Sequence, residues 1–200
     1  MTDTFFTIEH AVENILYKDK GSKFWGFAFP VSTIEDVKDV LQKIKKEHPT
    51  AGHHCYAYKL GTEKTIQYRA NDDGEPNGTA GIPIYNQILS HNLTNLVIIS
   101  VRYFGGTKLG VSGLIKAYKT NAKETLEVAQ IIEKKIEDQL TISFQYPQLS
   151  EVMNRIKKNE ATILKQKMEL SCEIQVSIRK SKTESFIEEL SLLKNVITSL

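Results

Sequence analysis

Two glycine-rich loops flank a short apolar run near the middle of this 200-residue chain. The first loop spans residues 71–81 (NDDGEPNGTAG), and the second spans residues 102–110 (RYFGGTKLG). The run between them, Leu96–Val101, is rich in β-branched residues and is short, so it predicts a buried strand. A helical pattern follows the second loop. A strand, a glycine-rich loop and a helix in this order often leave backbone N–H groups free to bind an anion.

Residues 1–135 are expected to form one α+β domain of order β-β-α-β-β-α-β-α, with the helices packed on a mostly antiparallel sheet. Thr33 and Asp36 have the spacing of a helix-capping box. The expected elements are a strand near Thr7–Tyr17, a strand at Lys23–Val31, a helix from Ser32 or Thr33 to Pro49, strands at His54–Leu60 and Lys64–Arg69 joined by residues 61–63, a helix at Pro83–Ser90, a strand at Leu96–Tyr103 and a long helix after Gly110. The apolar positions of that last helix that we expect to face the core are Val111, Ile115, Tyr118, Ala122, Leu126 and Ala129.

Residues 136–200 are expected to form a second domain after a linker at Glu133–Lys135. Their pattern predicts a βαββαβ order, which is the ferredoxin-like arrangement. The expected elements are strands at 139–146, 161–167, 169–179 and 195–199 and helices at 148–158 and 183–193.

Composition excludes several classes of protein. The chain has 26 Lys and Arg against 24 Asp and Glu, a net charge of +2 that does not by itself indicate a nucleic-acid-binding protein. Its two cysteines give neither a disulfide framework nor a zinc spacing, and no apolar run approaches the length of a membrane span. The start of the chain lacks the pattern of a signal peptide. A cytoplasmic protein that does not enter membranes is therefore expected.

The loops and several upstream residues resemble the signature of the IMPACT family, whose bacterial members are the YigZ-like proteins. The resemblance covers the whole chain and rests on Ser22–Gly26, His54–Tyr58, Asp72–Pro76, Gly78–Gly81 and Arg102–Gly110. It implies an N-terminal domain with the α+β fold shared by a ribosomal small-subunit protein domain and domain four of elongation factor G. It also implies a C-terminal domain similar to domain five of that factor, and a link to the regulation of translation.

The second loop begins a basic segment that is the expected phosphate-binding or RNA-binding site. From Val101 to Lys123 the chain has five Lys or Arg residues and no acidic residue. We expect no enzymatic activity, no cofactor and no DNA specificity, and RNA or the ribosome as the partner. The residues assigned to this site are Arg69, Arg102, Tyr103, Gly105, Gly106, Lys108, Lys116 and Lys119. A tight turn whose glycines serve geometry alone is the structural alternative.

The first loop contains the signature segment Asp72-Asp73-Gly74-Glu75-Pro76. Its composition is typical of a turn, and a structural or partner-contact role is expected for it. Its carboxylates are also suited to hold Mg²⁺ or to act as general bases. An enzyme that acts on a small phosphorylated or nucleotide substrate, with the second loop holding phosphate, is therefore the alternative function.

Three further features have alternative interpretations. The cluster of His48, His53, His54 and Cys55 suggests a zinc site or a Cys–His hydrolase. However, successive side chains of a strand point to opposite faces, so these residues do not converge locally, and a buried Cys55 is expected instead. The C-terminal domain is an alternative site for a protein partner. The tyrosines of the first domain are candidates for stacking on RNA, and they are Tyr56, Tyr58, Tyr68, Tyr85, Tyr103 and Tyr118.

Overall fold

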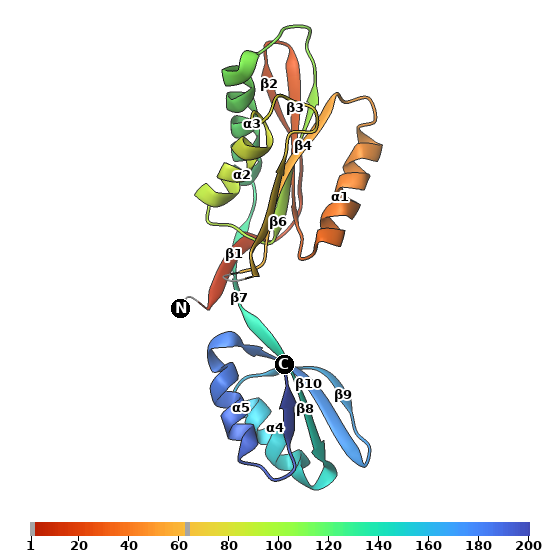
Figure 1. Cartoon of the computed structure of the whole chain (residues 1–200), viewed down its shortest axis with the longest axis vertical. Helices are drawn as coiled ribbons and strands as arrows, with labels where there is room; N and C mark the ends of the chain where they lie inside the picture. The colour runs from red at the N-terminus through yellow and green to blue at the C-terminus, as the bar shows by residue number, and fades with distance from the viewer. Residues whose placement is uncertain (1–2, 63–64) are drawn as a thin grey trace. The chain divides into compact units, whose positions relative to one another are not determined.

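The computed structural model describes residues 3–62 and 65–200, which form two compact units (Figure 1). The division lies between Lys134 and Lys135, and Asp3 and Thr4 belong to the second unit. The Asp3 carboxylate accepts a hydrogen bond from the Ser181 backbone N–H at 3.2 Å and forms an ion pair with Arg179. No helix among the described residues is both long and apolar enough to cross a membrane.

The first unit is built on a five-stranded, fully antiparallel sheet of order β2-β3-β6-β4-β5. The bounds of these strands are Val12–Asp19 (β2), Ser22–Pro30 (β3), Leu96–Tyr103 (β6), His53–Leu60 (β4) and Gln67–Asn71 (β5). The mostly antiparallel sheet and the strand Leu96–Tyr103 were predicted, and both are confirmed. The turn residue Glu63 and the start of the expected strand at Lys64 lie outside the described residues.

Helices cover both faces of this sheet (Figure 1). Helix α1 (Ile34–Glu47) lies on one face, and α2 (Gly81–Ser90) and α3 (Gly110–Glu127) lie on the other. The central strand β6 is therefore buried on both sides, which explains its continuous apolar run. Its odd-numbered residues pack toward α1, and Leu96 and Ile98 pack toward α2 and α3.

The start of α1 is set by the predicted capping box. The Thr33 hydroxyl accepts the Asp36 N–H at 3.1 Å, and the Asp36 carboxylate accepts the Thr33 N–H at 2.9 Å. These reciprocal bonds satisfy N–H groups that the first turn of a helix leaves without partners. Hydrogen bonds from the backbone N–H groups of Ser32 and Thr33 lower the pKa of Asp36 from its usual value.

The structure corrects two boundaries. The expected first strand near Thr7–Tyr17 is two strands, β1 (Thr4–Ile8) and β2, and β1 pairs with β7 (Ile131–Lys135) in a separate two-stranded sheet. The expected linker at Glu133–Lys135 is therefore the end of a strand. The pairing of β1 with β7 joins segments more than 120 residues apart, so no local pattern indicates it.

The buried face of α3 also differs from the expectation. Val111 is 60% exposed and Ile115 is 39% exposed, so neither belongs to the core. The buried positions are instead Leu114, Ala117, Tyr118, Asn121, Ala122, Thr125 and Leu126. The predictions for Tyr118, Ala122 and Leu126 are thus confirmed, and Ala129 packs partly buried against the same core. The apolar pattern did not indicate Asn121 and Thr125, two polar residues that are buried with hydrogen-bond partners.

The second unit has the predicted βαββαβ order and an antiparallel sheet of order β11-β8-β10-β9. Two helices and one face of this sheet enclose a separate apolar core. The elements are β8 (Glu137–Gln145), α4 (Leu149–Lys158), β9 (Thr162–Lys167), β10 (Ser171–Arg179), α5 (Thr183–Ser191) and β11 (Ile197–Ser199).

Helix α3 approaches β3 closely at Gly26. The Asn121 side chain donates to the backbone carbonyls of Ile15 and Phe24 at 3.0 and 3.2 Å and accepts from the Ser100 hydroxyl at 2.6 Å. A Cβ atom on Gly26 would lie 2.0 Å from Thr125 Oγ1. Glycine is thus required at this position by the short distance between helix and strand.

We predict that Gly26→Ala lowers the free energy of unfolding of the first unit by about 1–3 kcal/mol, because the added methyl group overpacks the contact with α3. Trp25, the one tryptophan of the chain, lies in β3, so its fluorescence during urea unfolding follows this unit. Gly52→Ala is the matched control, because its Cβ would meet no atom closer than 3.8 Å. A second change, Thr125→Ala, should restore part of the loss, and equal stabilities of Gly26→Ala and wild type would contradict the contact.

Candidate functional site

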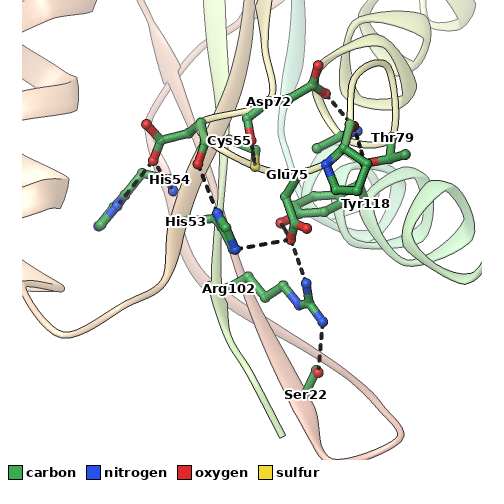
Figure 2. A network of polar contacts seen from close by, with 12 residues as sticks. Ser22, His53, His54, Cys55, Asp72, Glu75, Thr79, Arg102 and Tyr118 are labelled. Atoms are coloured by element: carbon green, nitrogen blue, oxygen red, sulfur yellow. Dashed lines mark hydrogen bonds and ion pairs between the residues drawn. The ribbon is translucent and has the colours of Figure 1, made fainter. Parts of the chain in front are cut away.

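Asp72 closes the first glycine-rich loop (Figure 2). Its Oδ1 accepts the backbone N–H groups of Ala80 and Gly81 at 2.9 and 2.8 Å, and its Oδ2 accepts that of Gly78 at 2.9 Å. Ala80 and Gly81 begin α2, so the carboxylate satisfies N–H groups at a helix N-terminus. A Cβ on Gly81 would lie 2.4 Å from the Asn71 backbone nitrogen, which explains the glycine. Asp72 therefore serves the internal geometry of the loop.

Glu75 points from the same loop into the protein (Figure 2). Its Oε1 accepts from Arg102 Nη1 and from the Tyr118 hydroxyl, both at 2.7 Å. The Glu75 side chain is 3% exposed and that of Arg102 is 7% exposed, so the ion pair is buried. It connects the first loop to the end of β6 and to the middle of α3.

The surroundings of this ion pair offset part of its desolvation cost. The Arg102 guanidinium lies 5.6 Å from the ring centroids of both Phe24 and Phe104, and its Nη2 is 3.4 Å from Ser22 Oγ. Burial, with the nearby Cys55 and Glu75, raises the pKa of Tyr118, so its hydroxyl stays protonated and donates to the carboxylate. Among the described residues, Arg102 Nε has no hydrogen-bond partner.

Asp73 connects the first loop to β4. Its carbonyl oxygen is 2.9 Å from His53 Nδ1, and its Oδ2 accepts the His54 backbone N–H at 2.7 Å. Asp73 has a φ of 42° and Gly74 a φ of 88°, so the turn passes through the left-handed region in which glycine is favoured. The other ring nitrogen of His53, Nε2, lies 3.8 Å from Glu75 Oε1.

The second glycine-rich loop is anchored at Gly105 and open beyond it. The Gly105 N–H donates to Ser22 Oγ at 3.2 Å, and a Cβ on Gly105 would lie 1.9 Å from the Gly21 carbonyl carbon. Residues 106–108 are exposed. Helix α3 then begins at Gly110, and no side chain caps its N-terminus. The loop thus presents backbone and Lys108 to solvent beside a helix N-terminus, where backbone N–H groups favour anions.

Three predicted basic residues lie together along this part of the chain. Lys108, Lys116 and Lys119 are exposed, and none forms an ion pair with another of the described residues. Lys123 is also exposed but lies 3.4 Å from the Glu127 carboxylate. The exposed lysine face of α3 was predicted and is confirmed.

The other predicted basic and aromatic residues lie elsewhere. Arg102 is buried in its ion pair with Glu75. Tyr103 lies on the α1 face of the sheet, where its hydroxyl is 2.9 Å from His48 Nδ1. Arg69 is exposed on the edge strand β5, whereas α3 packs over β2 and β3 at the opposite edge. Of the predicted set, Lys116 and Lys119 are exposed on α3 and Lys108 is exposed in the loop just before it, whereas Arg69 and Tyr103 lie in other parts of the sheet.

The histidine–cysteine cluster is dispersed, as strand alternation predicts. Cys55 is fully buried, burial raises the pKa of its thiol, and the Sγ atom donates to the Asp72 carbonyl at 3.0 Å. Its role as a small buried side chain is thus confirmed. The described residues contain no group of three or more His, Cys, Asp or Glu side chains arranged to hold a metal ion. The carboxylates of the signature segment Asp72–Pro76 face separate partners within the protein.

The tyrosines do not form one stacking surface. Tyr118 and Tyr58 are buried, and Tyr103 bonds to His48. Tyr68 and Tyr85 stack on each other with ring centroids 4.7 Å apart. Tyr58 and Tyr118 are therefore too buried to stack on RNA, and the remaining tyrosines come from different parts of the sheet and α2.

Sequence reasoning missed the roles of Ser22 and Tyr118 in the Glu75–Arg102 site. Tyr118 was expected as a core residue or as a candidate for stacking on RNA, and its hydroxyl contact with Glu75 spans 43 positions in the sequence. Ser22 bonds across 83 positions to the second loop. The only signal for Ser22 is its place in the segment Ser22–Gly26 that resembles the IMPACT family.

Comparison with known proteins decides the family. Residues 20–126 match the family model described as the Impact N-terminal domain. The chain belongs to the IMPACT family. IMPACT family member YvyE of Bacillus subtilis is 33% identical over 195 residues, which cover 98% of this chain and 89% of the relative. An IMPACT family member of Haemophilus influenzae is 33% identical over 176 residues, 86% of this chain and 84% of that protein.

The fold of this IMPACT family chain is also found in a solved structure over its full length. A crystal structure of a hypothetical protein has a TM-score of 0.75 at 24% identity, covering 99% of this chain and 97% of the other. The matched family segment contains both glycine-rich loops and every residue of the Glu75–Arg102 site.

We predict that Arg102→Met destabilises the first unit by about 3–5 kcal/mol, because the Glu75 carboxylate stays buried without its counter-charge. The double variant Arg102→Met/Glu75→Gln should recover most of this loss, since it removes the unpaired charge. Urea unfolding followed by Trp25 fluorescence measures both effects, with Lys119→Met at an exposed site as control. Additive losses in the double variant would contradict the pairing.

We predict a loss of stability on mild acidification that depends on His54. Burial lowers the pKa of His54 below its usual 6.5, the value expected in the unfolded chain. As the pH falls from 6.5 toward the lowered folded pKa, the unfolded state binds a proton that the folded state does not, so stability falls. The slope from this residue is at most about 1.4 kcal/mol per pH unit.

Urea unfolding measures the free energy of unfolding at several pH values from about 7.5 to about 5.5. This range lies above the pKa values of most carboxyl groups, so their titration contributes little. His54→Gln should flatten the dependence over this range. His10→Gln, at a side chain that is 79% exposed, is the matched control and should leave it unchanged. Identical pH profiles for wild type and His54→Gln would show that His54 does not cause the slope.

Proposed function

We propose that this chain binds RNA, alone or within the ribosome, without catalysing a reaction, and that it thereby modulates translation. The observation that carries the proposal is the surface formed by Lys108, Lys116 and Lys119 beside the uncapped N-terminus of α3, which we name the α3 lysine surface. Its cations are not neutralised within the described chain, so they are available for phosphates.

Each part of this surface has a distinct role in the proposal. Lys108, Lys116 and Lys119 pair with successive phosphates of the RNA backbone. The exposed N–H of Gly106 and those at the start of α3 reinforce the contact, because a helix N-terminus carries partial positive charge. Arg102 acts from inside the protein, where it and Ser22 hold the Gly105 end of the loop in place.

The carboxylates of the first loop favour a binding role over an enzymatic one. Asp72 accepts three backbone N–H groups, and Glu75 is buried against Arg102 and Tyr118. These bonds use both oxygens of Asp72 and the Oε1 of Glu75, which a metal or a substrate proton would require. The signature segment thus serves in this proposal to fix the geometry beneath the α3 lysine surface.

The exposed sheet face of the second unit supports placing the RNA site on the first unit. The non-buried side chains along the middle of β8 and β10 are Gln139, Thr141, Ser143, Glu173, Gln175 and Ser177. None of these is aromatic, whereas sheets that bind single-stranded RNA stack bases on aromatic rings. Two lysines of β9, Lys165 and Lys167, lie on the same face opposite Gln175 and Glu173. We therefore assign the second unit to a protein partner.

The family resemblance supports the link to translation. We propose that the first unit has the fold shared by a ribosomal small-subunit protein domain and domain four of elongation factor G. The second unit, with its βαββαβ order, would be ferredoxin-like and similar to domain five of that factor. Both units would then belong to classes found in ribosome-bound proteins.

We predict that a fluorescent single-stranded RNA binds the chain with an affinity that weakens with salt. The slope of log affinity against log salt should be roughly 0.7 for each phosphate contacted. Lys108→Glu and Lys116→Glu should each weaken binding and lower this slope by about one contact. Fluorescence anisotropy across a salt series measures both quantities.

Lys194→Glu is the matched control, because it makes the same change of charge at an exposed residue of the second unit. It should leave the slope unchanged. Salt-independent binding, or equal weakening by Lys194→Glu and Lys108→Glu, would contradict the α3 lysine surface as the site.

A further inference from the structure

A groove lies on the α1 face of the first unit, away from α2 and α3. It lies between α1 and strands β4 and β5 and encloses about 720 Å³, a size typical of sites for small molecules. Its apolar floor includes the Tyr56 ring and Leu41. Because α1 and α3 cover opposite faces of the sheet, this groove is separate from the α3 lysine surface.

Positive charge dominates the rim of the groove. Lys38, Lys45 and Lys46 of α1 line it, and all three are exposed. Lys38 is 3.2 Å from the exposed Glu35 carboxylate, and Lys45 is 3.8 Å from Asp73 Oδ1. Lys46 forms no ion pair with any described residue. These three lysines exceed the carboxylates of Asp73 and Glu35 by one positive charge, that of Lys46, which favours an anionic occupant.

A fourth cation lies on the same face of the sheet as the groove. In the pairing of β4 with β5, Tyr56 is opposite Asn71 and Tyr58 is opposite Arg69, and paired residues project from the same face. Arg69 does not line the groove itself, but its charge adds to the positive potential on this face.

The floor is suited to a planar ring. Tyr56 is only partly buried, and its ring is nearly parallel to that of Tyr58, with centroids 6.5 Å apart and an interplanar angle of 9°. The Asn71 side chain uses its oxygen to accept the Asp73 N–H at 2.8 Å, so its NH₂ group is left to donate. Gln42 brings a second amide to the lining. Amides beside an aromatic ring are the groups with which proteins recognise nucleobases.

We propose that this groove binds one nucleotide, with its base against Tyr56 and its phosphate among Lys38, Lys45 and Lys46. The amides of Asn71 and Gln42 meet the polar edge of the base. An acidic peptide would use the lysines but would leave the ring and the amides without partners, so the lining favours a nucleotide. The inference goes beyond the proposed function, because its residues lie on the other face of the sheet.

The test is a titration of the full chain with adenosine and uridine 5′-monophosphates, followed by calorimetry and by chemical-shift changes. We expect a dissociation constant of about 1 mM or lower, and at least about tenfold weaker binding by Lys46→Glu. Lys46 is exposed, so this variant should fold normally. Lys194→Glu makes the same change of charge at an exposed residue of the second unit, so it is the matched control and should bind nucleotide as wild type does.

Further probes separate the sources of binding. Adenosine without phosphate, inorganic phosphate alone and a short glutamate-rich peptide should each bind more weakly than the mononucleotide. Phosphate or peptide that binds as well as the nucleotide would overturn the proposal, and so would nucleotide binding that Lys46→Glu does not weaken. RNA binding and mononucleotide binding should respond to different variants, which distinguishes the two sites. Lys108→Glu should impair RNA binding at the α3 lysine surface and leave mononucleotide binding unchanged.

Discussion

The buried ion pair between Glu75 and Arg102 is the interaction on which the first unit depends. It joins the signature loop to the central strand β6, and the Tyr118 hydroxyl brings α3 to the same carboxylate oxygen. Through Ser22, the guanidinium also reaches the start of the second glycine-rich loop. Four segments that are distant in sequence thus converge on one charge pair, and their relative positions follow from its geometry.

A buried ion pair is weak evidence for stability, because desolvation of both groups opposes their attraction. Here the ion pair contributes by specifying how the loop, the strand and the helix are positioned relative to one another. An apolar replacement would fill the same space, but it would not specify which atoms of the loop, the strand and the helix must meet. Rings of Phe24 and Phe104 exclude water from the guanidinium, which strengthens this selection. The first glycine-rich loop and the start of the second are therefore positioned by a polar network that is almost entirely buried.

Local patterns in the sequence predicted much of the fold. The apolar run of β6, the capping box of Thr33 and Asp36 and the βαββαβ order of the second unit all follow from neighbours within a few positions. Contacts that span the chain were not predictable in this way. The pairing of β1 with β7 and the burial of Arg102 depend on partners that are distant in the sequence. A basic residue beside a glycine-rich loop has the same local sequence pattern whether its side chain faces solvent or a buried glutamate. For the candidate site, the exposed lysines of α3 were predictable and the inward direction of Arg102 was not.

The close backbone contact between Gly21 and Gly105 has a consequence for the entropy of binding in the proposed function. The β2–β3 turn leaves no room for the start of the second loop to move inward, whereas the neighbourhoods of Gly106 and Gly110 are open. In that proposal, one end of the loop is already in place before RNA arrives, so less conformational entropy is lost there on association. The two glycines thus fix one end of the loop, although glycine is the residue most often associated with mobility.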